Sequence, residues 1–341
     1  MKVYKFGGAS VKDANGVRNL HKIISNSNDN LVVVISAMGK TTNALELVVN
    51  SFFNHKSDTE ALLKKVVDYH ENIINDLFGA NRTEIDSHIN GLYEKINGIL
   101  SDKPSLSYDY EYDRIVSFGE LISTTIVACY LKYQGLNADW IDIRECIITD
   151  SNHRDANVNI ELSSKFTKSA FEGKKIAITQ GFIAGTTTNQ TTTLGREGSD
   201  YSAAILANLL DAETVIIWKD VPGVMNADPK IYSDVQIIPV LSYKEAIELS
   251  YCGASVIHPK TVKPLQNKKI PLYVKSFLDP DAPGSVINEY TERINLPPIY
   301  INKRNQVLLS LTPRDFSFIA EERLSKIFGV LASYRLKSSL V

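Results

Sequence analysis

The sequence contains little cysteine and no long hydrophobic run, and both absences narrow the possible classes of protein. The three cysteines, Cys129, Cys146 and Cys252, show no Cys-x-x-Cys spacing, so neither a disulfide framework nor a zinc site is indicated. The six histidines form no His-Glu-x-x-His cluster, so we expect no metal held by protein ligands. No apolar run approaches the roughly 18 residues of a membrane span, and no signal-peptide pattern opens the chain. We therefore expect a reduced, cytoplasmic setting and no membrane partner.

The chain also lacks an excess of positive or negative charge. The 37 Lys and Arg residues nearly balance the 39 Asp and Glu residues, so the net charge is −2 and nucleic-acid binding is not expected. A hydrophobic content of 44% and a charged content of 22% are ordinary for a soluble globular protein. A chain of 341 residues is long enough for two domains, or for one large α/β domain with an additional piece.

The sequence does contain an alternation of short apolar runs with longer helical patterns. The apolar runs, several of them hydrophobic throughout, predict strands at 3–6, 31–36, 138–142, 175–180, 214–219 and 271–276. Apolar residues at helical spacing predict helices at 11–25, 42–53, 59–78, 84–100, 113–133, 199–210 and 242–252. This alternation predicts an α/β fold, in which a mainly parallel sheet is sandwiched between helices and ligands lie at the carboxyl ends of the strands.

Two regions depart from that alternation. Residues 58–106 are almost wholly helical and predict a helical insertion, which we expect to cover part of a substrate site. Proline and glycine clusters at 279–284 and 296–298 predict a domain boundary near residue 295. Beyond it the pattern predicts a strand at 306–311, a helix at 318–328 and the start of a strand at 334–340. Such a unit is too small to bury its own apolar face.

The first candidate site lies at the end of the first predicted strand, where Lys5 is followed by Phe6, Gly7 and Gly8. Two glycines let backbone N–H groups approach an anion closely, and the lysine adds a full positive charge. The segment predicts a phosphate grip, although an edge strand with a solvated lysine fits these residues equally well.

A second glycine-containing turn, at 36–43, follows the second predicted strand and includes Thr41 and Thr42. Its Gly-Lys-Thr sequence is not a P-loop, because Val34 stands where that motif requires glycine. The turn still offers hydroxyl groups to a small polar ligand.

A third segment, Gly195-Arg196-Glu197-Gly198-Ser199-Asp200, precedes a predicted helix. Ser199 or Asp200 can cap that helix, whose N-terminus attracts anions, and Arg196 has the forked geometry that binds carboxylate or phosphate. A capped helix with a surface arginine is the simpler alternative.

Two further features bear charged residues. The loop at 218–230 contains Lys219, Asp220, Asp228 and Lys230, and it either frames a nucleotide or is only a polar connection. Glu120 lies in an apolar helical pattern, where its carboxylate faces either a ligand amine or solvent.

Together these segments resemble the amino-acid-kinase superfamily and, within it, the aspartate kinases, over essentially the whole chain. The resemblance rests on motifs at 5–11, 117–120, 195–200, 218–230 and 251–259, which occur in the family's order. The tail at 308–318 looks like the opening of an ACT regulatory domain. The resemblance implies a catalytic domain at 1–294 and a partial ACT-like α+β segment at 295–341 in a truncated product.

The resemblance implies transfer of the ATP γ-phosphate to the β-carboxylate of L-aspartate, the first step of lysine, threonine and methionine biosynthesis. The substrate carboxylate, with a pKa near ~3.9, is itself the nucleophile, so no general base is required. Mg²⁺ is expected to arrive on the nucleotide phosphates. A homodimer, and a lysine or threonine effector acting through the regulatory region, are also implied.

The resemblance also assigns roles to individual residues. It implies that Lys5 and Asp200 are catalytic. The substrate-binding residues that it implies are Thr42, Glu120, Arg196, Glu197, Gly198 and Ser199. The nucleotide-binding residues that it implies are Lys5, Gly7, Gly8, Ser10, Lys219, Asp220, Met225 and Lys230.

Four positions depart from the family pattern. Ala9 replaces a common threonine, Ser255 a lysine, Met225 an aromatic residue and Lys230 an arginine. These departures bear on nucleotide affinity rather than on the reaction class. Kinases of glutamate, N-acetylglutamate, carbamate or UMP, and an amino-acid sensor without catalysis, are the alternatives.

Overall fold

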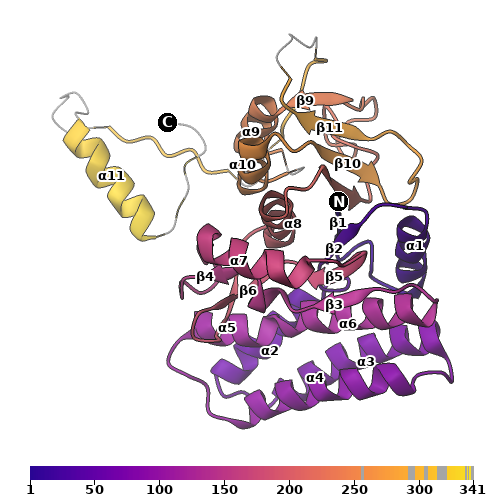
Figure 1. The fold of residues 1–341 in the computed structure, drawn as a ribbon. Helices are drawn as coiled ribbons and strands as arrows, with labels where there is room; N and C mark the ends of the chain where they lie inside the picture. The colour runs from indigo at the N-terminus through magenta and orange to yellow at the C-terminus, as the bar shows by residue number, and fades with distance from the viewer. Residues whose placement is uncertain are drawn as a thin grey trace.

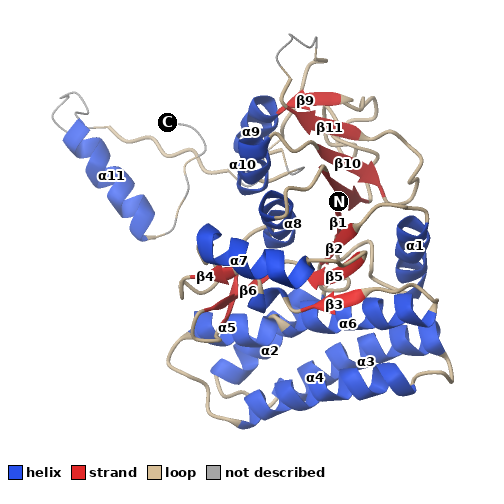
Figure 2. Ribbon diagram, viewed as in Figure 1, coloured by secondary structure: helices blue, strands red, loops and turns tan. Residues whose placement is uncertain are grey.

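The computed structural model describes residues 1–254, 257–290, 296–302, 306–312, 321–334, 336 and 338. Its strands are β1 (Lys2–Phe6), β2 (Leu31–Ile35), β3 (Asp139–Ile141), β4 (Ile148–Thr149), β5 (Ile176–Gln180), β6 (Ile183–Thr186), β7 (Thr191–Thr193), β8 (Thr214–Lys219), β9 (Val240–Ser242), β10 (Leu272–Ser276) and β11 (Ser285–Asn288). Its α-helices are α1 (Ala14–Ser25), α2 (Thr41–Phe53), α3 (Thr59–Phe78), α4 (Thr83–Ser101), α5 (Tyr108–Val116), α6 (Phe118–Tyr133), α7 (Ile160–Phe171), α8 (Gly198–Leu209), α9 (Tyr243–Cys252), α10 (Pro259–Lys268) and α11 (Glu321–Ser333). Figure 2 shows the strands gathered at the centre with helices around them.

An eight-stranded sheet with the order β3-β5-β2-β1-β8-β10-β11-β9 forms the centre of the fold. Neighbouring strands run parallel, except that β10 and β11 are antiparallel. Strand β2 is buried at every position, as expected of a strand covered on both faces. Figure 1 shows α1 and α8 on opposite sides of β1 and β2. The predicted α/β sandwich with a mainly parallel sheet is confirmed.

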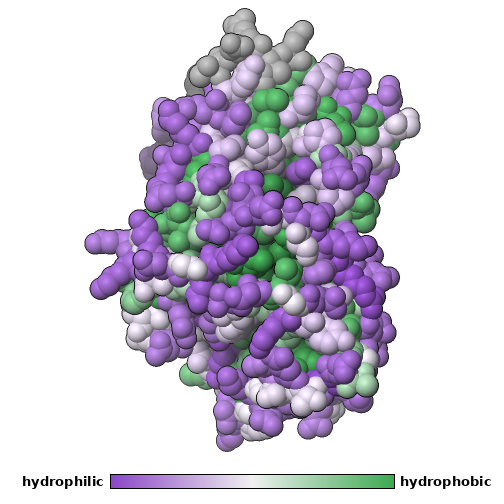
Figure 3. All heavy atoms as spheres, turned by 45° about the vertical axis from the view of Figure 1, so that its right-hand side comes forward, coloured by the Kyte–Doolittle hydropathy of each residue, from purple (hydrophilic) through white to green (hydrophobic). Residues whose placement is uncertain are grey.

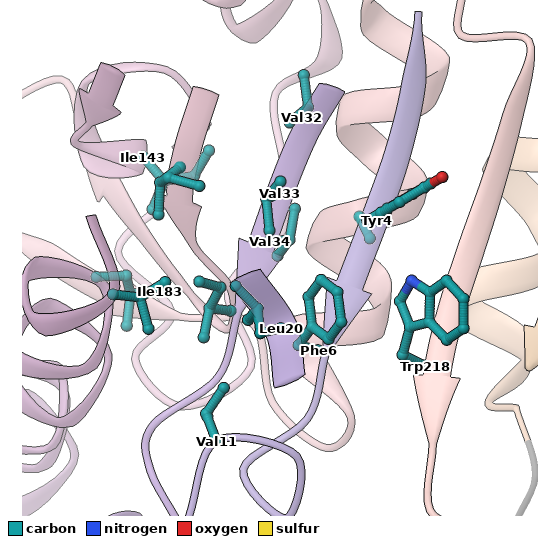
Figure 4. Packing of buried hydrophobic residues seen from close by; sticks show 14 of the residues in the cluster. Tyr4, Phe6, Val11, Leu20, Val32, Val33, Val34, Ile143, Ile183 and Trp218 are labelled. Atoms are coloured by element: carbon teal, nitrogen blue, oxygen red, sulfur yellow. The ribbon is translucent and has the colours of Figure 1, made fainter. Parts of the chain in front are cut away.

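Aromatic packing joins the two central strands β1 and β8. The ring of Phe6 is stacked on that of Trp218 at 6.1 Å between centroids, and Phe277 packs edge-on against Phe6 at 5.9 Å. Figure 4 shows Tyr4 and Phe6 of β1 facing Trp218. Burying one such ring stabilises the fold by about 1.5–3 kcal/mol. Backbone pairing sets the spacing of these two strands, and the rings stabilise one face of their ends, which carry the charged residues described below.

The region predicted as a helical insertion forms α3 and α4. Helix α3 packs on α2, and α4 packs on α6, so the two helices form an additional outer layer, which Figure 1 shows at the bottom of the molecule. No residue of 58–106 lines the charged cavity described below. The apolar faces of α3 and α4 pack on other helices, and the expected cover over a substrate site stays a prediction.

The helix predicted at 113–133 is interrupted. Helix α5 ends at Val116, and Ser117 separates it from α6. The stretch Tyr108–Tyr133 is long and apolar enough to cross a membrane. However, 83% of the 18-residue apolar segment within it is buried inside the protein. It is a core element of the fold.

Sequence patterns did not predict several of the smaller elements. Strands β4, β6 and β7 form a separate small sheet and are two to four residues long, with threonine and glycine in place of an apolar run. Helix α7 has many exposed positions, and α10 contains Pro264 in its interior. Pattern-based prediction missed the three strands because no apolar alternation marks them. It missed α7 and α10 because their buried positions include the polar residues Ser163, Thr167 and Thr261.

The tail differs from its prediction. Residues 306–311 are not a strand, and the helix α11 (Glu321–Ser333) extends beyond the predicted end at 328, while residues 318–320 lie outside the described residues. Helix α11 has no buried residue and stands apart from the sheet in Figure 1. The proposed boundary near residue 295 and most of the strand predicted at 334–340 lie outside the described residues. A partial ACT-like fold is not confirmed.

Candidate active site

The ends of β1 and β8 bring Lys5 and Lys219 to one side of the sheet. Phe6 pairs with Trp218 in the parallel register, so Lys5 and Lys219 project to the face opposite these two rings. Helix α8 contacts β1 and β8 and carries Asp200. Lys5 Nζ lies 2.6 Å from Asp200 Oδ1, and Lys219 Nζ lies 3.6 Å from Asp200 Oδ2.

Asp200 is ionised in this position. It is buried in the first turn of α8, where the helix N-terminus favours negative charge. Burial by itself would raise the pKa of Asp200, but the positive charges of Lys5 and Lys219 outweigh it and hold the pKa below its ordinary value. One carboxylate therefore fixes two ammonium groups side by side.

Glu120 is a second buried carboxylate, at the start of α6. Its Oε1 accepts a hydrogen bond from the backbone N–H of Ala37 at 3.3 Å. Its Oε2 is buried and has no hydrogen-bond partner among the residues that the structure describes. Desolvation raises the pKa of Glu120 to about 8. A buried acid with one unsatisfied oxygen is a receptor for a positively charged ligand group.

A polar cavity of about 530 Å³ collects these groups. Its lining residues are Lys5, Ser36, Thr42, Tyr112, Glu120, Arg154, Phe182, Thr193, Gly195, Arg196, Glu197, Gly198, Ser199, Asp200 and Lys219. Every residue predicted to be catalytic or substrate-binding thus lines a single cavity. Cationic and anionic side chains both face it, so it suits a small zwitterionic ligand that carries additional negative charge.

A second, more apolar cavity of about 380 Å³ shares Lys219 with the first. It contains the other predicted nucleotide-binding residues of the 218–230 loop, Asp220, Met225 and Lys230. Apolar residues of α9 and of the 299–302 segment complete its lining, among them Ala246, Leu249 and Ile299. An apolar cavity with charges at one end suits a base and its phosphates.

Gly7, Gly8 and Ser10 line neither cavity. A Cβ at Gly8 would lie 2.5 Å from Ala37 O, and Gly8 O accepts a hydrogen bond from Gly39 N at 2.9 Å. Ser10 is buried, and its N–H donates to Gly7 O. The glycine turn is therefore required for close packing between the loops after β1 and β2. Its predicted contact with nucleotide stays a prediction.

Ser36 of the predicted 36–43 turn also lines the polar cavity, whereas Tyr112, Arg154, Phe182 and Thr193 belong to no segment that the sequence indicated. Phe182 and Arg154 adopt positive φ values of 67° and 68°, which no residue-type signal announces. Among the described residues, no group of three or more His, Cys, Asp and Glu side chains could hold a metal ion. Ser255, one of the departures noted above, lies outside the described residues.

Figure 3 shows a mostly hydrophilic surface on one face of the molecule, with hydrophobic residues exposed in separate small areas. The described part of the chain thus shows no broad apolar surface on this face. The polar cavity and the more apolar cavity, which contain the predicted site residues, are therefore the candidate ligand-binding sites.

Comparison with known proteins shows which family this chain is similar to in sequence. A sequence profile described as the Amino acid kinase family matches residues 1–276. Lysine-sensitive aspartokinase 3 of Escherichia coli (strain K12) is 32% identical over 352 residues, which cover 99% of this chain and 75% of that protein. The chloroplastic bifunctional aspartokinase/homoserine dehydrogenase 2 of Arabidopsis thaliana is 34% identical over 296 residues, but the chain spans only 32% of its length.

Comparison with solved structures leads to the same family. The crystal structure of E. coli aspartokinase III in complex with aspartate and ADP, an R-state, matches with a TM-score of 0.82 and 29% identity. That match covers 100% of this chain and 76% of the E. coli chain. The T-state complex of the same protein with lysine and aspartate matches with a TM-score of 0.83 and 32% identity, covering 98% and 75% of the two chains.

Proposed function

Since this chain belongs to the amino acid kinase family and, within it, to the aspartokinases, we propose that it transfers the γ-phosphate of ATP to the β-carboxylate of L-aspartate. The products are ADP and 4-phospho-L-aspartate, an intermediate of lysine, threonine and methionine biosynthesis. The proposal accounts for both cavities, one for a zwitterionic amino acid and one for a nucleotide.

The observation that carries the proposal is the charge pattern of the polar cavity. Glu120 offers an unsatisfied, buried carboxylate oxygen to the substrate ammonium. Arg196 offers a guanidinium to the α-carboxylate, with Glu197, Gly198 and Ser199 of the same segment beside it. Thr42 adds a hydroxyl group. L-aspartate has the ammonium, the α-carboxylate and the additional β-carboxylate that these groups can bind.

The transfer itself needs little from the protein beyond alignment and charge. The β-carboxylate is already ionised at neutral pH, so one of its oxygens forms the bond to the γ-phosphorus while the bond to the leaving ADP oxygen breaks. Lys5 lies at the floor of the polar cavity and stabilises charge on the phosphoryl group as it passes. Lys219 faces both cavities and holds the phosphates at their junction. Asp200 keeps the two lysines in position.

The nucleotide is proposed to occupy the second cavity. Met225 and the apolar residues of α9 would face the base, while Asp220 and Lys230 lie on the charged 218–230 loop. Mg²⁺ bound to the phosphates would neutralise part of their charge. The buried carboxylate of Asp200, which lines the polar cavity and pairs with the shared Lys219, is the group that fits a magnesium-bound water there.

A coupled assay of ADP release tests this function. We expect ADP release that depends on L-aspartate, and no comparable release with glutamate, N-acetylglutamate, carbamate or UMP. Calorimetric binding of aspartate without ADP production would instead favour an amino-acid sensor. Turnover of another member of that panel would reassign the substrate.

Regulation and assembly are part of the same proposal. The E. coli relative has been crystallised with lysine in a T-state, so lysine is the first effector to test, with threonine second. Inhibition of ADP release by lysine, measured beside the oligomeric state by light scattering, tests the effector and the expected homodimer. A cytoplasmic location is proposed for the chain.

A further inference from the structure

Arg154 is a guanidinium of the polar cavity that no motif indicated. It lies in the loop between β4 and α7, and it faces the same cavity as Arg196. Its side chain is 39% exposed, whereas that of Lys5 is 10% exposed. Lys5 therefore marks the floor of the cavity and Arg154 its mouth.

Helix α5 holds the side chain of Arg154 in a defined direction. The guanidinium carbon lies 4.3 Å from the ring centre of Tyr112 and 5.7 Å from that of Tyr108. Nη1 of Arg154 donates a hydrogen bond to Asp109 Oδ1 at 3.3 Å. Tyr108 and Tyr112 are one helical turn apart, so they form a common surface beneath the guanidinium.

The backbone of Arg154 is held as firmly as its side chain. Its φ of 68° lies in the left-handed region, which is unfavourable for any residue with a Cβ. The fully buried Asp113 accepts the N–H of Arg154 at 3.1 Å and the Thr193 hydroxyl at 2.6 Å, and His153 Nδ1 lies 2.9 Å from it. A buried carboxylate that maintains a strained arginine at a cavity is typical of a functional position.

The guanidinium retains donors for a ligand. Its Nη2 lies 3.8 Å from Glu46 Oε1, which is beyond hydrogen-bond distance. Apart from the bond to Asp109, no described side chain accepts a hydrogen bond from it. An arginine held by aromatic stacking and a single hydrogen bond can bind a carboxylate without losing its support.

We propose that Arg154 binds the α-carboxylate of the amino-acid substrate together with Arg196, as a specificity-determining residue. The inference rests on the proposed aspartate kinase function. The β-carboxylate must lie near Lys5 at the floor to meet the phosphoryl group, so the α-carboxylate lies toward the mouth, where Arg154 is located. Asp113 is a positioning residue that acts through Arg154.

The test is kinetic, with paired substrates. L-aspartate is compared with its α-amide, which retains the ammonium and the β-carboxylate but lacks the α-carboxylate charge. In Arg154→Gln we expect the KM for aspartate to rise about 10- to 100-fold, as for loss of a hydrogen bond between charged groups, with the KM for ATP unchanged. The KM for the α-amide should change little. The KM for the α-amide divided by the KM for aspartate should therefore fall about tenfold or more.

Two further variants separate binding from folding. Arg154→Gly suits the positive φ, so it should fold at least as stably by thermal unfolding and show the same loss of discrimination. Arg144→Gln is the matched control, since Arg144 is an arginine of similar exposure that pairs with Asp142 outside this cavity. It should leave both KM values unchanged.

The outcomes are distinguishable. A wild-type protein that releases no ADP with aspartate counts against the proposed function. If the wild type is active and both Arg154→Gln and Arg154→Gly keep the wild-type ratio of the two KM values, the present inference alone is overturned. An equal rise in both KM values also overturns it, because that is the signature of a purely structural role.

Discussion

The polar cavity and the more apolar cavity meet at Lys219, yet they are built in different ways. The polar cavity takes its two lysines from the ends of β1 and β8 and its two buried carboxylates from the first turns of α6 and α8, whereas Arg154, Arg196 and Glu197 come from adjoining loops. The apolar cavity takes much of its lining from the 218–230 loop, the end of α9 and the segment 299–302. The groups proposed for catalysis, Lys5 and Asp200, lie on regular elements, whereas the cavity proposed for the nucleotide depends largely on loops and on chain distant in sequence.

Asn226 illustrates this dependence. Its backbone N–H donates to Gln236 O at 3.0 Å, and its Oδ1 accepts from Gln236 N at 2.7 Å. Its Nδ2 donates to Pro298 O at 3.0 Å, and its carbonyl accepts from Tyr300 N at 2.8 Å. One buried side chain thus ties the loop to the segment that follows the sheet. Four predictions use this difference between the cavities, in order of decreasing effect.

Lys5→Ala should have the largest effect and should act on the polar cavity alone. We expect kcat to fall about 10²- to 10³-fold, as when one preorganised charge contact is removed. Lys2→Ala is the control on the same strand, because Lys2 pairs with Asp29 at the surface. Its kcat should match that of the wild type. An unchanged kcat in Lys5→Ala would remove Lys5 from the mechanism.

The structure adds a cost in stability that the sequence does not reveal. Without Lys5, the ion pairs of the buried Asp200 within the described part of the chain are reduced to that with Lys219 at 3.6 Å, and removing one member of a buried ion pair costs roughly 3–5 kcal/mol. The double variant Lys5→Ala with Asp200→Asn should recover much of the lost free energy of unfolding while remaining inactive. Urea denaturation separates the two effects.

Arg196→Ala should raise the KM for aspartate about 10- to 100-fold, as expected for a lost charged hydrogen bond, and leave the KM for ATP unchanged. Initial rates over a matrix of both substrates give the two constants. If only the KM for ATP moved, the assignment of the two cavities would be reversed.

Aspartate binding should depend on pH through Glu120. The pKa of Glu120 is raised to about 8, so the ligand-free protein holds a proton that must leave when the substrate ammonium binds. Aspartate affinity should therefore rise up to about tenfold per pH unit as pH increases toward 8. Calorimetry in buffers of different ionisation enthalpy should show about one proton released per aspartate near pH 7. Glu120→Gln should bind weakly, with no such proton release.

Glu120 should also make the free energy of unfolding depend on pH. The unfolded chain loses the Glu120 proton near the ordinary pKa of 4.5, whereas the ligand-free fold keeps it to about pH 8. The contribution of Glu120 to the free energy of unfolding is therefore constant below 4.5 and falls as pH rises from there to about 8. The difference in unfolding free energy between the wild type and Glu120→Gln should follow this curve, and a flat difference would contradict the burial argument.

Asn226→Ala should have the smallest effect and should act on the apolar cavity. Loss of the bonds to Pro298 and Gln236 loosens the loop, so we expect the KM for ATP to rise about three- to tenfold, with kcat and the KM for aspartate nearly unchanged. Asn208→Ala is the control, since Asn208 also donates to a proline carbonyl, that of Pro264, away from both cavities. A larger effect on aspartate than on ATP would show that the cavities are not independent.

Sequence patterns anticipated the elements that carry a clear period. The hydrophobic strands β1, β2, β5, β8 and β10, and helices such as α3, were predicted within a few residues. The patterns failed for β4, β6 and β7, whose short threonine-rich segments pair only because the chain around them is already folded. The patterns also predicted one continuous helix in place of α5 and α6, because a serine such as Ser117 is compatible with a helix interior.

What the sequence alone determined is the inventory of chemistry: a lysine before two glycines, an arginine and an aspartate at a helix start, and a glutamate in an apolar helix. Types of residue and local spacing suffice for that, because each motif is local. Only the tertiary structure decided that Glu120 has an unsatisfied oxygen, that Asp200 lies between Lys5 and Lys219, and that Arg154 faces the same cavity. Burial, charge pairing and a left-handed backbone depend on which distant segments pack together, and no local pattern encodes that.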